Sequence, residues 1–573
     1  MRPFVRALVG AGVVIVAGVA TVTIPGHTSG AAPPPVAGSA VFASDWPTYH
    51  HDGLGGGVDP SGTDLSPATV AWTSAPLDGQ IYGEPLVEAG RVVVATENDT
   101  VYELAPDTGV VIWSTHVGTA VPSGDLPCGN ISPTVGITGT PVIDPTRGEV
   151  FAVADQLVGS SAQHYLVGVD LYTGAVLLHQ AISLPGADQL AQLQRTGLAL
   201  DGGNVVEGFG GNSGDCGNYH GWVISIPEGG GAQKSFEVAS AAHDSQGAVW
   251  MGGAAPLVDA SGDVWFATGN SAFNSSTDTY DNSDAVVELN SGLVEQQFFT
   301  PSTWYSDNGS DLDLGSSSPA LLADGLAFQA GKSRKAYVVS SSSLGGVGHQ
   351  LAEASSYCGA DVDGGSAVVG NVVYTPCQAG VVKTQITPGN PPTITSVWKT
   401  STGSGGPPIV AGGEVWTINP GNGKLFGLDP STGNAAQTFS LGSEANHFPT
   451  PTVADGLLLA ASTNQVHAFH GPAGLPGPGF QITTTSLSDA TRGAEYGVQL
   501  GASGGATPYK WKLAPASPKP PRGLRLKADG LLTGNPKKQD TPGAYTFTVQ
   551  ATTHRTRGNP RVTATKTLTL HLL

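Results

Sequence analysis

One unit of sequence recurs eight times between residues 84 and 470, and this repeat limits the fold more than any other feature. Each unit reads as two short strands, a third strand that ends in a Thr-Gly turn, and a fourth strand. The clearest copy runs from Glu84 to Trp113 and contains the turn Asp107-Thr108-Gly109. The other copies begin near Thr140-Pro141, Leu198-Ala199, Ala255-Pro256, Ser318-Pro319, Ser366-Ala367, Pro407-Pro408 and Thr450-Pro451.

The spacing of the copies, about 52 residues, is typical of the four-stranded blades of a β-propeller. Four short strands cannot bury both faces alone, so we expect the blades to stack around an axis and share a core. The last unit breaks off after residues 465–469, and residues 70–73 read as its missing fourth strand. Pairing these two segments closes the ring and removes an exposed edge. The sequence therefore predicts an all-β, eight-bladed propeller over residues 45–475.

Composition agrees with a turn-rich β protein and excludes other classes. The 573 residues include 81 Gly and 42 Pro, poor helix formers that argue against a large helical bundle. The net charge of −20 is unevenly distributed: 10 basic and 41 acidic residues give residues 41–475 a charge of −31, whereas 13 basic and 4 acidic residues give residues 476–573 a charge of +9. The acidic total excludes general nucleic-acid binding, which needs a basic surface.

The N-terminus reads as a secretion signal. Two arginines precede an uncharged stretch over residues 7–24, and small residues and prolines follow it. We predict a leader over residues 1–40, cleaved after Ala20 or Ala40, with an uncleaved membrane anchor as the alternative. No comparably long apolar run occurs later, so no membrane span is expected after the leader. These features predict an extracellular or cell-surface protein.

The four cysteines are even in number and are compatible with disulfides in an exported chain. Three pairings can be drawn. The short intervening loop favours Cys358–Cys377, which leaves Cys128–Cys216 as the second bond. No Cys-x-x-Cys motif occurs, so a c-type haem site and a zinc ribbon are excluded.

The repeat resembles that of the quinoprotein alcohol dehydrogenase-like propellers, which are built from PQQ-like repeats. Residues 425–433 carry the Leu-x-x-Leu-Asp-x-x-Thr-Gly pattern of that family, and residues 45–52 are similar to the usual start of such propellers. The resemblance covers roughly three quarters of the chain. It implies the propeller fold but not an activity, because the repeat serves packing and is shared with non-enzymatic scaffold members.

The same resemblance implies candidate site residues. Catalytic members hold the quinone PQQ against Ca²⁺ with a Glu and an Asn, use an Asp as base, and cover the ring with a disulfide between adjacent cysteines. Asp215 stands in place of the calcium-binding Glu, and Asn270 matches the calcium-binding Asn. The counterpart of the base motif, residues 300–305, has no carboxylate at the needed position, and no adjacent cysteines exist. We therefore expect a site that is decayed or was never catalytic.

Two further segments contain residues that could form ligand-binding loops. Asp307, Asp311 and Asp313 offer several oxygens to Ca²⁺, but the glycine and the terminal Glu of an EF-hand are missing, which favours a solvated loop between blades. Residues 331–333 resemble the end of a phosphate-binding loop. Its first glycine is absent and the preceding residues read as a strand, so that interpretation is excluded.

Most tryptophans of the propeller are expected to pack between blades. Trp304 instead falls in a predicted loop and is the best candidate for an exposed binding aromatic. The tryptophans expected to pack are Trp113, Trp250, Trp265, Trp398 and Trp416.

A second module follows a Pro- and Gly-rich linker at residues 471–480. The motifs in residues 504–549 occur in an order that resembles the bacterial putative Ig domain, which is similar to cadherin-type sandwiches. Alternating apolar residues in 545–551 suit a two-sheet sandwich. The resemblance implies an immunoglobulin-like domain over residues 481–573. Residues 551–554 lack the Asp with which the family often ends this strand, which puts cadherin-like calcium binding in doubt.

These observations predict an exported, non-catalytic propeller that binds an extracellular protein or a glycan, with the Ig-like module as spacer or adhesive. The alternative is a divergent PQQ- and calcium-dependent quinoprotein dehydrogenase, and a third hypothesis is a polysaccharide hydrolase or lyase. The basic residues of the second module could hold it to an anionic cell envelope or to the propeller itself. They include Lys510, Lys512, Lys519, Arg522, Arg525, Lys527, Lys537 and Lys538.

Overall fold

The structure is a computed structural model that describes residues 45–240, 245–272, 280–475, 481–482, 484, 486–503, 508–515, 517–554 and 563–573. The predicted leader over residues 1–40 lies outside the described residues, and so do residues 476–480 of the predicted linker. Strands dominate the described part of the chain, in which α1 (Trp304–Asn308) is the one α-helix. No helix of that part is long and apolar enough to cross a membrane.

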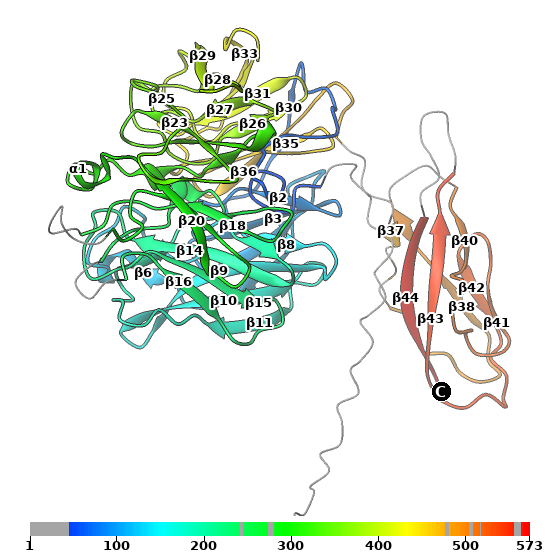
Figure 1. Cartoon of the computed structure of the whole chain (residues 1–573). Coiled ribbons are helices and arrows are strands. Elements are labelled where there is room, and N and C mark those ends of the chain that lie inside the picture. Colours follow the sequence, from blue (N-terminus) through cyan, green and yellow to red (C-terminus); the bar gives the residue numbers. More distant parts are fainter. Residues whose placement is uncertain are drawn as a thin grey trace, which may run out of the picture. The chain divides into compact units, whose positions relative to one another are not determined.

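Eight sheets, here called blades 1 to 8, follow one another along the propeller region (Figure 1), and they are antiparallel except that β24 (Gly346–Val347) adds to blade 4 parallel to its last strand. Blade 1 is formed by β2 (Leu86–Glu88), β3 (Arg91–Thr96), β4 (Thr100–Leu104) and β5 (Val111–His116). Blade 2 is formed by β8 (Val142–Asp144), β9 (Glu149–Val158), β10 (Ser161–Asp170) and β11 (Val176–Ala181). Blade 3 is formed by β12 (Gln192–Gln194), β13 (Ala199–Asp201), β14 (Asn204–Gly211), β15 (Trp222–Pro227) and β16 (Lys234–Glu237). Blade 4 is formed by β17 (Leu257–Val258), β18 (Val264–Ala267), β19 (Val286–Leu289) and β20 (Glu295–Thr300).

The second half of the ring repeats this order. Blade 5 is formed by β21 (Ala320–Leu321), β22 (Leu326–Ala330), β23 (Ala336–Ser340) and β25 (Ala352–Ala354). Blade 6 is formed by β26 (Ala367–Val369), β27 (Val372–Thr375), β28 (Val382–Thr387) and β29 (Thr393–Lys399). Blade 7 is formed by β30 (Ile409–Ala411), β31 (Glu414–Asn419), β32 (Lys424–Leu428) and β33 (Ala435–Ser440). Blade 8 is formed by β34 (Thr452–Ala454), β35 (Leu457–Ser462), β36 (Gln465–His470) and β1 (Thr69–Thr73).

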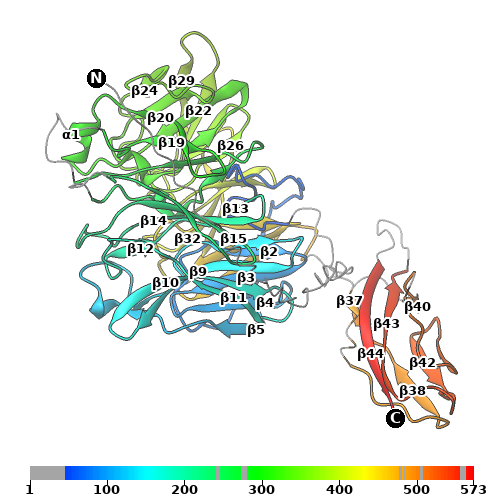
Figure 2. The ribbon, with the colours of Figure 1, turned by 60° about the horizontal axis from the view of Figure 1, so that its bottom comes forward.

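The last blade closes the ring with the first strand of the chain. β1 pairs antiparallel with β36, with Val70 opposite Phe469 and Thr73 opposite His467. This pairing confirms the prediction that residues 70–73 supply the missing fourth strand. The first strands of blades 8, 1, 2, 3 and 4 contact one another in that order, as expected for strands around a common axis. The eight-bladed all-β propeller is thereby confirmed, and Figure 2 shows its strands from a second direction.

The Thr-Gly turn of the repeat docks one blade on the next. Gly109 of blade 1 lies against the ring of Trp72 from blade 8, and the indole N–H of Trp72 donates to the carbonyl oxygen of Pro106 at 2.9 Å. Gly174 lies in the same way against Trp113, and Gly433 against Trp398. A side chain at the glycine would occupy the space of the indole ring, so the turn needs glycine for packing as well as for a positive φ.

Both disulfides are present as predicted. Cys128–Cys216 joins two loops that are 88 residues apart in sequence, and Cys358–Cys377 closes a loop of blades 5 and 6 with a separation of 19 residues. Cys358 and Cys377 are fully buried in the apolar cluster between those blades. The two bonds therefore have different surroundings, one at a loop pair and one in a core.

The C-terminal domain contains two three-stranded sheets and a two-stranded one, as expected for an Ig-like sandwich. Its core includes Trp511, Leu532 and Phe547. The strands are β37 (Gln481–Ile482), β38 (Tyr496–Gln499), β39 (Ala502–Ser503), β40 (Lys510–Leu513), β41 (Leu524–Leu526), β42 (Leu531–Gly534), β43 (Gly543–Thr552) and β44 (Thr563–Leu572).

Candidate functional site

A cavity of about 300 Å³ lies on one side of the propeller ring. Its walls come from loops that join the second to the third strand of a blade, or the fourth strand to the next blade. Because neighbouring strands in a blade run antiparallel, these two kinds of loop emerge on the same side of the ring. The polar and aromatic lining residues are Tyr82, Asn130, Arg195, Asn212, Ser213, Asp215, Tyr219, Trp250, Asn270, Asp311, Asp313, Lys332, His447 and Phe448.

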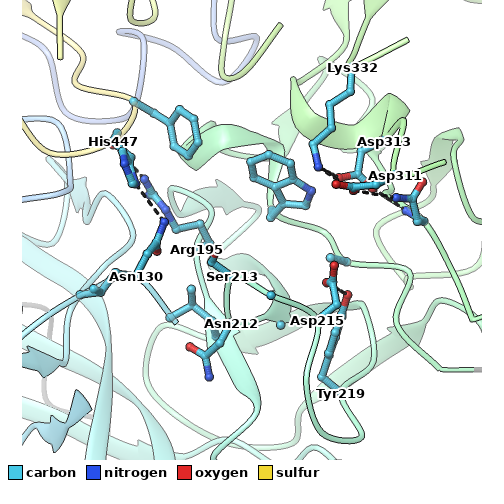
Figure 3. A pocket seen from close by; sticks show the side chains of 18 of the residues that line it. Asn130, Arg195, Asn212, Ser213, Asp215, Tyr219, Asp311, Asp313, Lys332 and His447 are labelled. Atoms are coloured by element: carbon cyan, nitrogen blue, oxygen red, sulfur yellow. Dashed lines mark hydrogen bonds and ion pairs between the residues drawn. The ribbon is translucent and has the colours of Figure 1, made fainter. Parts of the chain in front are cut away.

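One side of the cavity is built around an ammonium group (Figure 3). Lys332, in the turn between β22 and β23, lies 2.6 Å from Oδ2 of Asp313 and 2.9 Å from Oδ1 of Asp311. Burial alone would lower the pKa of Lys332, but Asp313 and Asp311 outweigh it and raise the pKa. Burial raises the pKa of Asp313, and Lys332 opposes that rise. The three side chains therefore form a compact charged group with one cation and two anions.

Asn270 and Asp215 complete this side of the cavity. The backbone N–H of Asn270 donates to Asp313 at 2.7 Å, and its side-chain amide donates to Asp311 at 3.1 Å. The amide oxygen Oδ1 of Asn270 is buried and has no hydrogen-bond partner among the described residues. Asp215 accepts a hydrogen bond of 2.6 Å from the hydroxyl of Tyr219, whose pKa is raised by burial and by Asp215. Every carboxylate that lines the cavity is therefore already engaged by a donor or a cation.

The opposite side of the cavity carries a buried guanidinium (Figure 3). Arg195 follows β12 and lies 5.1 Å from the centre of the Phe448 ring and 5.6 Å from that of Tyr82. It donates a hydrogen bond of 3.1 Å to the backbone oxygen of His447, and the His447 ring lies 3.2 Å from the amide of Asn130. Burial lowers the pKa of Arg195, although nearby acidic groups oppose that effect.

Trp250 connects the two sides of the cavity. It precedes the 3₁₀ turn η2 (Met251–Gly253) and is half-buried, with Nζ of Lys332 5.4 Å and the Phe448 ring 5.8 Å from the centre of its ring. The expectation that Trp250 packs between blades is therefore wrong, because it lies outside the strands and lines the cavity. Trp113 and Trp398 do pack between blades, as predicted.

The remaining predicted residues separate into two groups. Asp215, Asn270, Asp311 and Asp313 all line the one cavity, whereas Asp307 does not. Asp307 belongs to α1, is buried, and accepts a hydrogen bond of 2.6 Å from Thr303. The hypothetical calcium cradle of Asp307, Asp311 and Asp313 therefore does not form, because the helical turn directs Asp307 away from the other two.

Trp304 also departs from its prediction. It begins α1 rather than lying in a loop, and it is half-buried. Its ring packs edge-on against Tyr280 at 5.2 Å, and it does not line the cavity.

The cavity carboxylates Asp215, Asp311 and Asp313 do not form a close set of three within the described residues. Within the described residues, one set of three acidic groups has ligand atoms all within 4.8 Å of one another, and it consists of Asp259, Asp263 and Glu288. That set lies at the hairpin between β17 and β18 and not in the cavity.

The disulfide Cys128–Cys216 braces the cavity wall. Gly214 lies against Cys128: a Cβ atom added to Gly214 would lie 3.4 Å from Sγ of Cys128. Both Gly214 and Asp215 line the cavity. Asn130 and Ile131, two and three residues after Cys128, line it as well. The bond therefore joins two loops that form part of the same wall.

The repeat, the ring of eight blades and a cavity at the loop side define a PQQ-like repeat propeller. The family described as outer membrane protein assembly factor BamB matches residues 56–212 and 259–439, which is more than half of the chain. The chain belongs to this family. Residues 479–571 match the putative Ig domain, which confirms the second resemblance. A comparison with curated proteins finds no match.

Solved structures confirm the fold. The quinohemoprotein alcohol dehydrogenase ADHIIG from Pseudomonas putida HK5 is 12% identical, with a TM-score of 0.57 over 79% of this chain and 83% of the other. The quinohemoprotein alcohol dehydrogenase from Comamonas testosteroni is 16% identical, with a TM-score of 0.55 over 78% and 84%. At these identities the likeness establishes the propeller architecture and no activity.

Proposed function

We propose that the protein is an exported, non-catalytic binding propeller that takes a small, flat, carboxylated ligand in its cavity. The cavity combines aromatic side chains with a few convergent polar and charged groups, which is the usual composition of a small-molecule site. Trp250 offers a face for a flat ring, and Lys332 and Arg195 stand on either side of it. The disulfides support export, since such bonds persist in oxidising compartments.

The observation that carries the non-catalytic assignment is the engagement of every cavity carboxylate. Asp311 and Asp313 share the ammonium of Lys332, and Asp215 is held by Tyr219. A general base must be free to accept a proton from the substrate. The ion pair with Lys332 favours the charged form of Asp313 and opposes the rise that burial causes in its pKa, so Asp313 takes up a proton less readily than an unpaired buried carboxyl would.

The two groups that the family implies differ in how they fit. PQQ is a flat quinone with carboxylate groups, and the aromatic face of Trp250 with the guanidinium of Arg195 matches that chemistry. When bound in a dehydrogenase, PQQ supplies a two-electron acceptor. The case of Ca²⁺ is different: the ammonium of Lys332 already lies between Asp311 and Asp313, and the oxygens that the resemblance assigns to the ion are those of Asp215 and the side-chain oxygen Oδ1 of Asn270.

The experiment for this proposal is reconstitution of the full chain with PQQ and Ca²⁺, followed by a dye-linked assay over a panel of alcohols. We expect PQQ to bind and no alcohol-dependent reduction of the dye to follow. A known quinoprotein dehydrogenase serves as the positive control. Robust turnover of any alcohol would refute the non-catalytic assignment.

The second candidate function is a divergent quinoprotein dehydrogenase, and one observation favours it. The segment that lacks a carboxylate at residues 300–305 continues to Asp311 and Asp313, and both of these line the cavity beside Lys332 and Trp250. A carboxylate is therefore within the site, although displaced along the sequence. If this candidate is correct, Asp311→Asn abolishes turnover while PQQ binding persists.

For the Ig-like domain we propose attachment to an anionic surface outside the cell. The exposed lysines Lys510, Lys512, Lys537 and Lys538 belong to a module with a net charge of +9. Such a charge attracts polyanions and loses its effect as salt rises.

A further inference from the structure

We infer that Arg195 is the anion subsite of the cavity and binds a carboxylate of the ligand. This inference rests on the proposed function and adds to it the end of the cavity at which the anionic group lies. It follows from a comparison of the two cations that line the cavity, Lys332 and Arg195.

Lys332 has its counter-ions, whereas Arg195 has none in the part of the chain that the structure describes. Lys332 forms ion pairs with both Asp311 and Asp313. No carboxylate of the described residues lies within ion-pair distance of Arg195, although only 7% of that residue is exposed. Buried charges in proteins are normally paired, so an unpaired guanidinium at a cavity wall indicates that the partner is supplied from outside the chain.

The neighbours of Arg195 are committed to other contacts. Its hydrogen bond within the described residues goes to the neutral backbone oxygen of His447, at 3.1 Å. Glu97 is the carboxylate that acts on it electrostatically, but Glu97 accepts hydrogen bonds from the backbone N–H of Gly136 at 2.8 Å and from Thr138 at 3.0 Å. A guanidinium carries five N–H donors, which leaves donors for a planar anion.

The aromatic rings beside Arg195 hold the guanidinium in place. Tyr82 and Phe448 lie within 5.6 Å and 5.1 Å of its central carbon, distances at which a cation is attracted to the ring face. This fixes the orientation of the donors before any ligand arrives. A preformed fork of donors is what bidentate recognition of a carboxylate requires.

The charge distribution across the cavity gives the ligand a direction. The side with Lys332 also holds Asp215, Asp311 and Asp313, so its formal charge is −2. The Arg195 side is positive. A ligand with a carboxylate on a flat ring is therefore expected to place that carboxylate at Arg195 and its ring beside Trp250. The class of ligand is an aromatic or conjugated carboxylic acid.

The test compares two flat probes of equal size, 2-naphthoate and 2-naphthamide, by isothermal titration of the full chain. We expect wild type to bind naphthoate at least about tenfold more tightly than the amide, because a charge-assisted pair replaces a neutral one. In Arg195→Gln this preference disappears, and in Arg195→Lys part of it returns. Arg334→Gln, at an exposed arginine outside the cavity, is the matched control and keeps the full preference.

The outcomes separate the inference from the proposed function. Equal binding of the two probes by wild type, no binding of naphthoate, or an unchanged preference in Arg195→Gln overturns the anion subsite. The comparison of acid and amide on wild type decides the matter even if Arg195→Gln fails to fold. PQQ binding that persists while the acid preference is absent leaves the proposed function standing without this subsite. If wild type prefers naphthoate but does not bind PQQ, the anion subsite stands and the proposed function fails for PQQ.

Discussion

Three buried carboxylates between blades 1 and 2 set a pH response at the scale of single residues. Glu97, Asp99 and Asp155 are at most 2% exposed, and both oxygens of Asp99 and of Asp155 lack a hydrogen-bond partner. Burial, followed by the charges of Asp155 and Glu97, raises the pKa of Asp99 to about 9, and burial raises that of Glu97 to about 7. The folded protein therefore holds protons that the unfolded chain releases near about pH 4.

The sign of the effect follows from this difference. Between about pH 4 and pH 9 the folded state binds more protons than the unfolded state, so the free energy of unfolding falls as pH rises. Asp99→Asn removes one group that binds a proton in the folded state and releases it on unfolding. Asparagine also tolerates the φ of 52° at this position. We expect the variant to have a higher Tm than wild type at about pH 8 and a flatter dependence of Tm on pH. Asp107→Asn, at an exposed turn, should follow wild type, and a parallel shift at all pH values would contradict the account.

Two tryptophans of the propeller are expected to respond differently to substitution. Trp250 is half-buried at the cavity, whereas Trp416 is completely buried in the core of blades 7 and 8. Trp250→Leu should weaken PQQ binding at least about tenfold, because it removes the face on which a flat ring packs, with little change in Tm. Trp416→Leu should lower the free energy of unfolding by a few kcal/mol, roughly, and should leave affinity nearly unchanged in the folded fraction. Fluorescence titration and thermal unfolding of both variants check this, and a reversed assignment would refute the position of the site.

At the scale of elements, the Thr-Gly turn and the tryptophan of the preceding blade act as one docking unit. Gly109 has a φ of 68° and lies against Trp72 of β1, so it ties the strand that closes the ring to blade 1. The same relation holds for Gly174 with Trp113 and for Gly433 with Trp398. The contact explains why a turn glycine and a strand tryptophan occur in the same repeat.

Gly109→Ala is expected to destabilise the propeller by more than the cost of its backbone conformation. A positive φ costs an alanine about 1 to 2 kcal/mol, and the added methyl group also overlaps the Trp72 ring. Gly413→Ala is the matched control, since Gly413 has a φ of 81° and open space around it. The Tm of the two variants should differ, with Gly109→Ala lower. Equal losses would show that the contact with Trp72 does not contribute.

The elements could be predicted from the sequence because their signals are local. Each blade repeats the same strands and turns, and the incomplete last unit indicated its pairing with β1, which the structure confirms. The cavity could be predicted only in part. Asp215 and Asn270 were found by resemblance, but Arg195 and Trp250 were not, because their role depends on loops from different blades meeting at one place. Arg195 and its partner His447 are 252 residues apart, and no spacing in the sequence encodes that contact.

At the scale of the whole molecule, the chain joins an acidic propeller to a basic Ig-like domain. Residues 41–475 carry a charge of −31 and residues 476–573 a charge of +9. The exposed lysines Lys510, Lys512, Lys537 and Lys538 of the Ig-like domain are available to a polyanion. We propose different tasks for the two parts, with ligand binding in the propeller and surface attachment in the other domain.

Attachment through the Ig-like domain should depend on salt. We expect the full chain to be retained on beads coated with an anionic cell-wall polymer at low ionic strength and to be released as salt rises. Replacing Lys510, Lys512, Lys537 and Lys538 by Gln should reduce retention, whereas Lys424→Gln at the exposed first residue of the propeller strand β32 should not. Retention that is independent of both salt and these lysines would rule out electrostatic attachment.

Equilibrium dialysis of the full chain against PQQ measures whether the propeller cavity binds a flat, carboxylated ligand. We expect saturable uptake that approaches one PQQ per chain and is strongly reduced in Trp250→Leu. Absence of saturable uptake by the folded wild-type protein, or uptake that Trp250→Leu leaves unchanged, would contradict this expectation.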